Sequence, residues 1–173
     1  MTDPTWTTPT HVIAHGASDS AKFNAETVDN LLYLHAAKAG RFTAGPGAAN
    51  KLTWTSIQWD TALLETPNMW ASSPYPERIC PGIGGLWLVT LALSWPAGDY
   101  VGRIRLQKNG TDQVDSATVQ VLGGYSTSSS LTALVELDGE GDYINAHLYH
   151  DHDPLVLFSD DRARLDIAYL GSV

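Results

Sequence analysis

The densest group of potential metal ligands in this chain is the segment 147–153, HLYHDHD, which holds three histidines and two aspartates. Imidazole and carboxylate groups are common ligands of Zn²⁺ and related divalent ions. In an extended strand, successive side chains point to opposite faces, so His147 would lie on one face while His150 and His152 share the other. Two interpretations follow: a metal site built from His147, His150 and His152, or a polar strand end.

Motifs for catalysis are weak. The serines of segment 126–130 lack the G-x-S-x-G motif that positions a nucleophile at a strand-to-helix turn. Glu136 and Asp138 could pair as glycosidase carboxylates, but they alternate along an expected strand end, where solvent exposure is the default. The single cysteine, Cys80, lies in an apolar context and is expected to be a buried structural thiol. We therefore expect a protein that is not an enzyme and needs no cofactor, with a carbohydrate-active enzyme as one alternative.

The loop at 67–76, PNMWASSPYP, is the best candidate for a binding surface. It combines Met69, Trp70 and Tyr75, and aromatic residues and methionine are enriched at protein interfaces. Such a loop could contact a saccharide, a capsid subunit or a neighbouring chain. Its composition suits a lid folded onto the core equally well.

Composition limits the possible partners. The chain has 173 residues and a formal net charge of −9, with only 10 lysines and arginines. Nucleic acid is not an expected partner, because phosphate binding needs clustered basic residues. The first ten residues, MTDPTWTTPT, have neither the basic start nor the apolar stretch of a signal peptide, and no run approaches the ~18 apolar residues of a membrane span. We expect synthesis in the cytoplasm without membrane insertion, which is compatible with assembly into a virus particle.

Residues 52–173 have the pattern of an all-β domain, in which short alternating segments are separated by Gly, Pro and Ser. The expected strands are Thr53–Trp59, Glu77–Cys80, Gly85–Trp95, Asp99–Lys108, Asp115–Leu122, Ser130–Leu137, Asp142–His150 and Arg162–Leu170. The run Leu86–Leu93 is nearly all apolar, which predicts a strand buried on both faces. Asn109-Gly110 is a strong signal for a hairpin turn. Three tryptophans are expected in the core: Trp59, Trp87 and Trp95.

Residues 1–40 are predicted to be a separate docking or oligomerising module. They begin with a Thr/Pro-rich arm over 1–19, and a helix is expected over 24–39. The helix is predicted from an apolar stripe at i, i+3, i+4 and i+7: Val28, Leu31, Leu32 and His35. Gly40 fits the position just after the helix. The following segment, 41–51, is rich in Gly and Ala and is predicted to be a hinge.

The order of several short motifs resembles the C1q/TNF-like jelly-roll domains. The motifs are Ile57-Gln58-Trp59-Asp60, Pro81–Trp87, Arg103–Thr111 (RIRLQKNGT), Gly139–Tyr143 and Leu165–Gly171. The resemblance covers about residues 54–171, although the Pro-Gly-aromatic step of many C1q domains is lengthened here by extra glycines. It implies an all-β fold: a C1q/TNF-like antiparallel jelly-roll sandwich over 52–173, preceded by the arm and one short helix. It also implies a homotrimer.

The N-terminal module resembles a different group of proteins. Phe23–Leu34, FNAETVDNLLYL, is similar to a short helix near the start of many tailed-bacteriophage virion proteins, in which a Thr/Trp/Pro-rich arm such as Thr5-Trp6-Thr7 precedes it. The combination implies a structural protein of the virion: a minor tail protein, a fibre or a capsid-decoration protein. The residues expected to dock on other virion proteins are Trp6, Val28, Leu31 and Leu32. The trimeric knob would contact the capsid or a host cell-surface glycan. A soluble C1q/TNF-like binding module or lectin is the alternative.

Overall fold

A computed structural model of the chain describes residues 38–45, 47–66, 68–139, 141–152, 156–158 and 163–172. The chain divides into two compact units, residues 1–37 and residues 38–173. The expected arm and most of the expected helix fall in the first unit and lie outside the described residues. The same holds for the proposed docking residues: Trp6, Val28, Leu31 and Leu32.

Within the described residues the chain forms eleven strands and no helix. The strands are β1 Ala39–Ala44, β2 Gly47–Ala49, β3 Thr55–Ser56, β4 Trp59–Thr66, β5 Gly85–Trp95, β6 Tyr100–Lys108, β7 Asp112–Val121, β8 Thr127–Leu137, β9 Ile144–His150, β10 Val156–Phe158 and β11 Ala163–Gly171. Over this part of the chain, no helix is long and apolar enough to cross a membrane.

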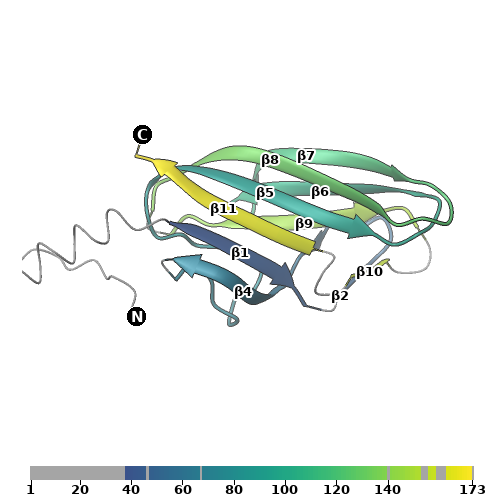
Figure 1. The fold of residues 1–173 in the computed structure, drawn as a ribbon, viewed down its shortest axis with the longest axis horizontal. Coiled ribbons are helices and arrows are strands. Elements are labelled where there is room, and N and C mark those ends of the chain that lie inside the picture. The colour runs from purple at the N-terminus through teal and green to yellow at the C-terminus, as the bar shows by residue number, and fades with distance from the viewer. Residues whose placement is uncertain are drawn as a thin grey trace, which may run out of the picture. The chain divides into compact units, whose positions relative to one another are not determined.

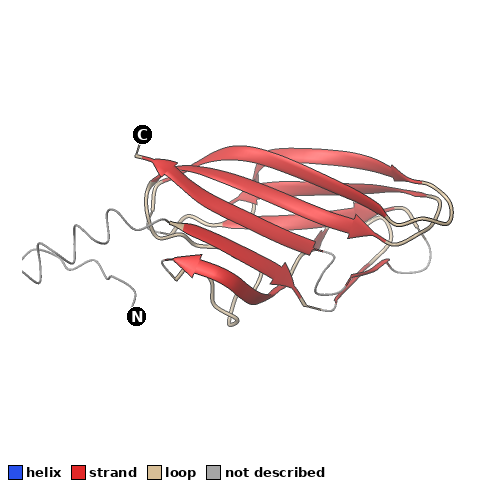
Figure 2. Ribbon diagram, viewed as in Figure 1, coloured by secondary structure: helices blue, strands red, loops and turns tan. Residues whose placement is uncertain are grey.

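The strands pair into two antiparallel sheets that pack face to face. The first sheet has the order β4-β1-β11-β5-β8 and the second the order β3-β9-β6-β7, while β10 and β2 form a separate pair. In Figure 1 the five-stranded sheet lies in front of β6, β7 and β9, and Figure 2 shows loops for the connections that the structure describes. Strands far apart in sequence are neighbours in the first sheet. The first and last strands of the domain, β1 and β11, pair with each other in this layer.

Side chains that alternate between the two faces of each strand build the core between the sheets. Along β5 the odd-numbered positions are buried and the even-numbered positions are half-buried. The expected core tryptophans are confirmed, because Trp59, Trp87 and Trp95 are all nearly or fully inaccessible. From the second sheet, Ile104 and Leu148 complete the same hydrophobic cluster.

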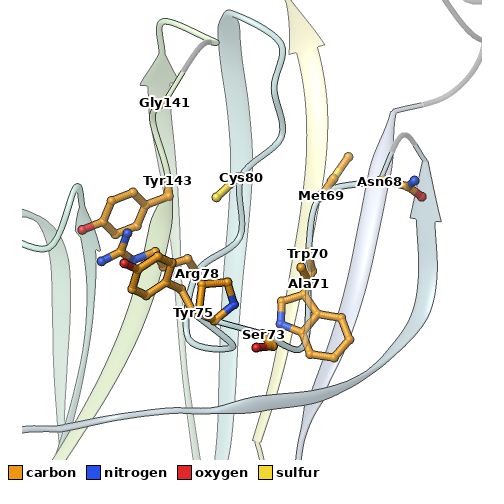
Figure 3. A pocket seen from close by; sticks show the side chains of 11 residues that line it. Asn68, Met69, Trp70, Ala71, Ser73, Tyr75, Arg78, Cys80, Gly141 and Tyr143 are labelled. Atoms are coloured by element: carbon orange, nitrogen blue, oxygen red, sulfur yellow. The ribbon is translucent and has the colours of Figure 1, made fainter.

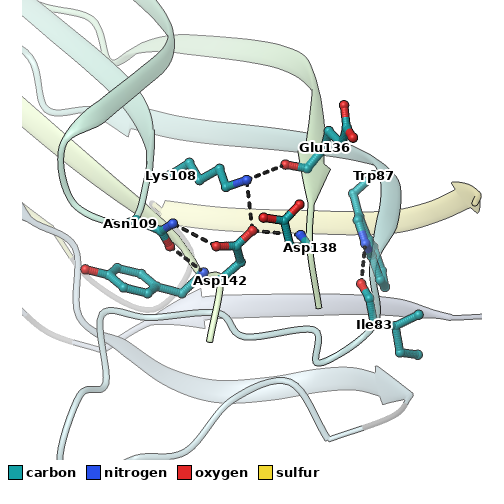
Figure 4. Close-up of polar contacts among 8 residues, drawn as sticks. Ile83, Trp87, Lys108, Asn109, Glu136, Asp138 and Asp142 are labelled. Atoms are coloured by element: carbon teal, nitrogen blue, oxygen red, sulfur yellow. Dashed lines mark hydrogen bonds and ion pairs between the residues drawn. The ribbon is translucent and has the colours of Figure 1, made fainter. Parts of the chain in front are cut away.

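The predicted hairpin turn at Asn109-Gly110 is also confirmed. Both residues have positive φ values, 55° and 75°, as the tight turn between two twisted strands requires. The turn is tied to the connection that follows β8 through Asp142 (Figure 4). The Asp142 carboxylate accepts hydrogen bonds from the backbone N–H of Asp138 at 2.7 Å and from the side-chain amide of Asn109 at 2.8 Å, and it pairs with Lys108 at 2.8 Å.

The structure corrects the predicted hinge at 41–51. These residues form most of β1 and all of β2, so the jelly-roll domain begins near Lys38 and not at residue 52. Gly40 is part of β1 and does not end a helix. A Cβ atom at Gly40 would lie 2.6 Å from the Phe42 ring, so glycine is required there by side-chain packing.

Candidate functional site

The loop between β4 and β5 is held in one conformation by hydrogen bonds along its length. The Glu65 carboxylate accepts from the backbone N–H groups of Met69 and, at 2.6 Å, of Trp70. The Trp70 indole N–H donates to the Pro76 carbonyl at 2.9 Å. Ile79 then pairs with Ile144 of β9 through two backbone hydrogen bonds of 2.9 Å. The loop is therefore anchored at both its β4 end and its β9 side.

This loop and the segment that leads into β9 line an open pocket of about 660 Å³, which we call the aromatic pocket. Its lining is Asn68, Met69, Trp70, Ala71, Ser73, Pro74, Tyr75, Arg78, Cys80, Gly141 and Tyr143. Figure 3 shows Tyr75, Arg78 and Tyr143 gathered on one side of the pocket and Met69 and Trp70 on the other. The Arg78 guanidinium lies 3.9 Å from the centre of the Tyr75 ring and 4.4 Å from the centre of the Tyr143 ring. Such cation–π contacts hold the guanidinium between two aromatic faces.

The structure places the three expected binding residues of this loop at different depths. Met69 is buried in the hydrophobic core and lines the pocket from the core side. Trp70 is half-buried and its ring packs 6.5 Å from that of Phe42, which makes it partly a lid on the core. Tyr75 is 53% exposed. Sequence reasoning missed Arg78 and Tyr143, which complete the pocket from outside the predicted segment.

Cys80 differs from expectation. It was predicted to be buried, but it is an exposed thiol that lines the aromatic pocket. Partial burial raises the pKa of the thiol, and the nearby positive charge of Arg78 lowers it by less. The thiol is therefore accessible but mostly protonated at neutral pH, which makes it a slow nucleophile.

The outward side of the five-stranded sheet is a second candidate surface, which we call the open sheet face. Its apolar part is formed where three strands lie in register, with Leu88 of β5 between Leu134 of β8 and Ala168 of β11. Leu134 is 58% exposed. Leu64 of β4 and Leu170 of β11 are exposed leucines of the same sheet. A row of leucines in water is unfavourable for a single chain, since each loses the free energy of apolar burial.

The other part of the open sheet face is polar. Asp166 pairs with Arg41 at 2.6 Å and with Arg164 at 3.0 Å, and the hydroxyls of Thr90 and Thr132 are 3.0 Å apart across two strands. A shallow pocket of about 620 Å³ lies over this part. The face is thus divided into an apolar and a polar region along the same strands.

The three histidines expected to bind metal are not brought together. His147 is on the outer side of the second sheet, where its backbone pairs with Arg105 and Ser56. His150 lies in the interior, and its Nε2 is 2.8 Å from the Ala49 carbonyl oxygen while its Nδ1 accepts from the His152 backbone N–H at 3.2 Å. Among the residues that the structure describes, no group of three or more His, Cys, Asp or Glu side chains is arranged to hold a metal ion.

His147 is a buried polar group with an unusual environment. It is 8% exposed, and its Nδ1 is buried without a hydrogen-bond partner. Its pKa is lowered to about 4, mainly by burial and to a smaller extent by the positive charge of Arg105, while Glu77 acts in the opposite direction. His147 is therefore neutral at physiological pH.

Comparison with known proteins identifies the fold. No family model matches the chain, and no curated protein matches it in sequence. Solved structures do match. They include murine APRIL at pH 5.0 (11% identity, TM-score 0.62, covering 78% of this chain and 100% of that one) and the globular domain of zebrafish complement 1qA (12%, 0.62, 80% and 100%). Eiger TNF from S. frugiperda matches at 13% identity with a TM-score of 0.58, covering 79% and 94%.

The part of the chain that the structure describes thus has the all-β jelly-roll sandwich fold of TNF and C1q domains. The jelly-roll fold expected from the sequence is confirmed, while the expected arm and most of the expected short helix lie outside the described residues. At these identities the likeness concerns the fold, and function has to be argued from the surfaces of this chain.

Proposed function

We propose that this protein is a trimeric binding knob of a bacteriophage particle, in which the open sheet faces of three copies meet. The observation that carries this proposal is the exposure of Leu134 beside Leu88 on that face. The sequence of β5 is that of a strand covered on both sides, yet the described residues bury only one side of it fully. Apolar surface of this kind is expected to be buried against other subunits.

The open sheet face has an apolar and a polar region, and this division suits threefold packing. The leucines would form the dry centre of the contact, and Arg41, Asp166 and Arg164 would lie in its polar part, as in other stable protein interfaces. The likeness in fold to TNF and C1q domains supports the same arrangement.

The virion assignment rests on the N-terminal sequence and its resemblance to tailed-phage proteins. The arm and helix would dock on capsid or tail proteins, through Trp6, Val28, Leu31 and Leu32. Three knobs held together contact a host surface or the capsid with an avidity above that of a single site. No catalytic step is part of this function.

The oligomeric contact is tested by light-scattering mass of the full chain, for which we expect three times the chain mass of 18.7 kDa. Leu134→Asp should reduce the mass to that of the monomer, because the charge would be buried in the contact. Leu122→Asp is the matched control, since Leu122 is 63% exposed but lies in the loop after β7, away from the open sheet face. A Leu134→Asp protein that remains trimeric would rule out this face as the contact.

A further inference from the structure

The aromatic pocket has a chemical character that the proposed function leaves unspecified. Among its described lining residues, Arg78 is the only charged side chain at neutral pH, and the Glu77 carboxylate that pairs with its Nε at 3.4 Å is not part of the lining. Most of the remaining lining is aromatic or aliphatic, and hydroxyl and amide groups are supplied by Ser73, Asn68 and Tyr75. A ligand that fits must combine one negative charge with an apolar face and several hydrogen-bonding groups.

The guanidinium of Arg78 is held in a way that suits recognition of a carboxylate. Its two faces are covered by Tyr75 and Tyr143, and its Nε is 3.4 Å from the Glu77 carboxylate. Its two terminal nitrogens form no ion pair with a carboxylate among the described residues. Arginine binds carboxylates through two parallel hydrogen bonds from such a planar edge.

The pocket is formed before any ligand arrives. The loop that carries it is fixed by Glu65, by the Trp70 indole and by the pairing of Ile79 with Ile144. The Cys80 N–H adds a hydrogen bond of 2.6 Å to the Met69 carbonyl. A rigid pocket binds small ligands with less loss of conformational entropy than a flexible loop.

We propose that the aromatic pocket binds an acidic saccharide, with the sugar carboxylate on the edge of Arg78 and a sugar ring against Tyr75 and Tyr143. The saccharide hydroxyls would reach Asn68 and Ser73. The proposal deepens the proposed function, in which the knob contacts a host glycan, and it rests on that function only for its biological setting. The volume of about 660 Å³ is enough for a disaccharide.

Cys80 provides a direct reporter of occupancy, because it is the single cysteine of the chain and it lines the pocket. The experiment measures the rate at which iodoacetamide alkylates the full-length protein, with and without cellobiouronic acid. Neutral cellobiose and benzoate are the comparison ligands. We expect cellobiouronic acid to slow alkylation in a saturable manner, and cellobiose and benzoate to protect at least about tenfold less well, since each lacks either the charge or the hydroxyls.

Variants assign the effect to Arg78. Arg78→Gln should weaken protection about tenfold or more, and Arg78→Lys should be intermediate because it keeps the charge without the planar edge. The matched control is Arg103→Gln. Arg103 lies in β6, its guanidinium is 5.3 Å from the centre of the Tyr149 ring, and it does not line the pocket. This variant should leave protection unchanged. Arg78→Lys keeps the test valid if Arg78→Gln does not fold.

The outcomes separate the two proposals. Any of four outcomes would overturn the acidic-saccharide site. Cellobiose could protect as well as cellobiouronic acid, benzoate could protect better, or no ligand could protect at all. The fourth outcome is an Arg78→Lys protein that binds like the wild type. Light-scattering mass is measured on the same samples. A trimer without saccharide protection refutes the pocket proposal alone, whereas a monomer with saccharide protection refutes the trimeric knob alone.

Discussion

Asp142 should make the stability of the domain depend on pH in a defined window. Asp142 is 9% exposed, and the pKa of its carboxyl group is lowered from 3.8 to about 2. The largest cause is the hydrogen bond from the backbone N–H of Asp138, followed by those from Lys108 and Asn109. These contacts favour the charged form in the folded state, so the domain gains stability above the unfolded-state pKa.

The size of the effect follows from the two pKa values. Each pKa unit corresponds to about 1.4 kcal/mol, so the change from 3.8 to about 2 corresponds to about 2 kcal/mol of folding free energy at neutral pH. This contribution is present above about pH 4 and is lost as the pH falls through about 2, because both folded and unfolded states are then protonated.

The assay is urea unfolding of the wild type and Asp142→Asn at a fixed protein concentration, from pH 7 down to pH 2. The variant should be less stable by about 2 kcal/mol at pH 7, and the difference should shrink towards zero at pH 2. Comparing two proteins cancels the titration of the other carboxylates. Asp112→Asn is the matched control, because Asp112 is an exposed carboxylate at the start of β7, close in sequence to the turn that Asp142 contacts, and its hydrogen bond comes from its neighbour Thr111. A difference that is as large at pH 2 as at pH 7 would refute the electrostatic explanation.

Two further predictions concern packing and the buried histidine. Gly102→Ala should destabilise the domain by about 1–3 kcal/mol in urea unfolding, because the added Cβ would lie 2.8 Å from the Trp95 ring, whereas Gly124→Ala, with nothing within 4 Å, should be close to neutral. His147 should titrate near pH 4 by NMR; Arg105→Gln should raise this pKa and Glu77→Gln should lower it. Since the pKa of an unfolded-state histidine is 6.5, the stability of the domain should fall as the pH drops from about 6.5 through 4. An NMR titration midpoint of His147 near 6.5 would contradict the burial of a neutral ring.

Most of the sandwich was predictable from local sequence patterns. The predicted strand Gly85–Trp95 has the same bounds as β5, because a long apolar run is flanked by turn residues on both sides. The hairpin at Asn109-Gly110 needs positive φ values that few other residue pairs adopt. These elements are determined by neighbours in the sequence.

The missed elements depend on contacts between distant residues. The sequence of β1 looks like a linker because it contains small residues. At Gly40, however, a small residue is needed because the Phe42 ring fills the space that a side chain would occupy. Cys80 was expected to be buried by residue type, but the pairing of Ile79 with Ile144 leaves it at the surface of a pocket. No local pattern brings Arg78 next to Tyr143, so the most specific part of the candidate site could not be predicted from the sequence.

The central claim, that the jelly-roll domain itself forms the trimer, is tested most directly by comparing the light-scattering mass of the full chain with that of residues 38–173, the compact unit that contains the described hydrophobic core. The open sheet face lies entirely within this unit, so we predict that both proteins are trimers. A full chain that is trimeric and a 38–173 protein that is monomeric would contradict the account, because the N-terminal module would then hold the three copies together.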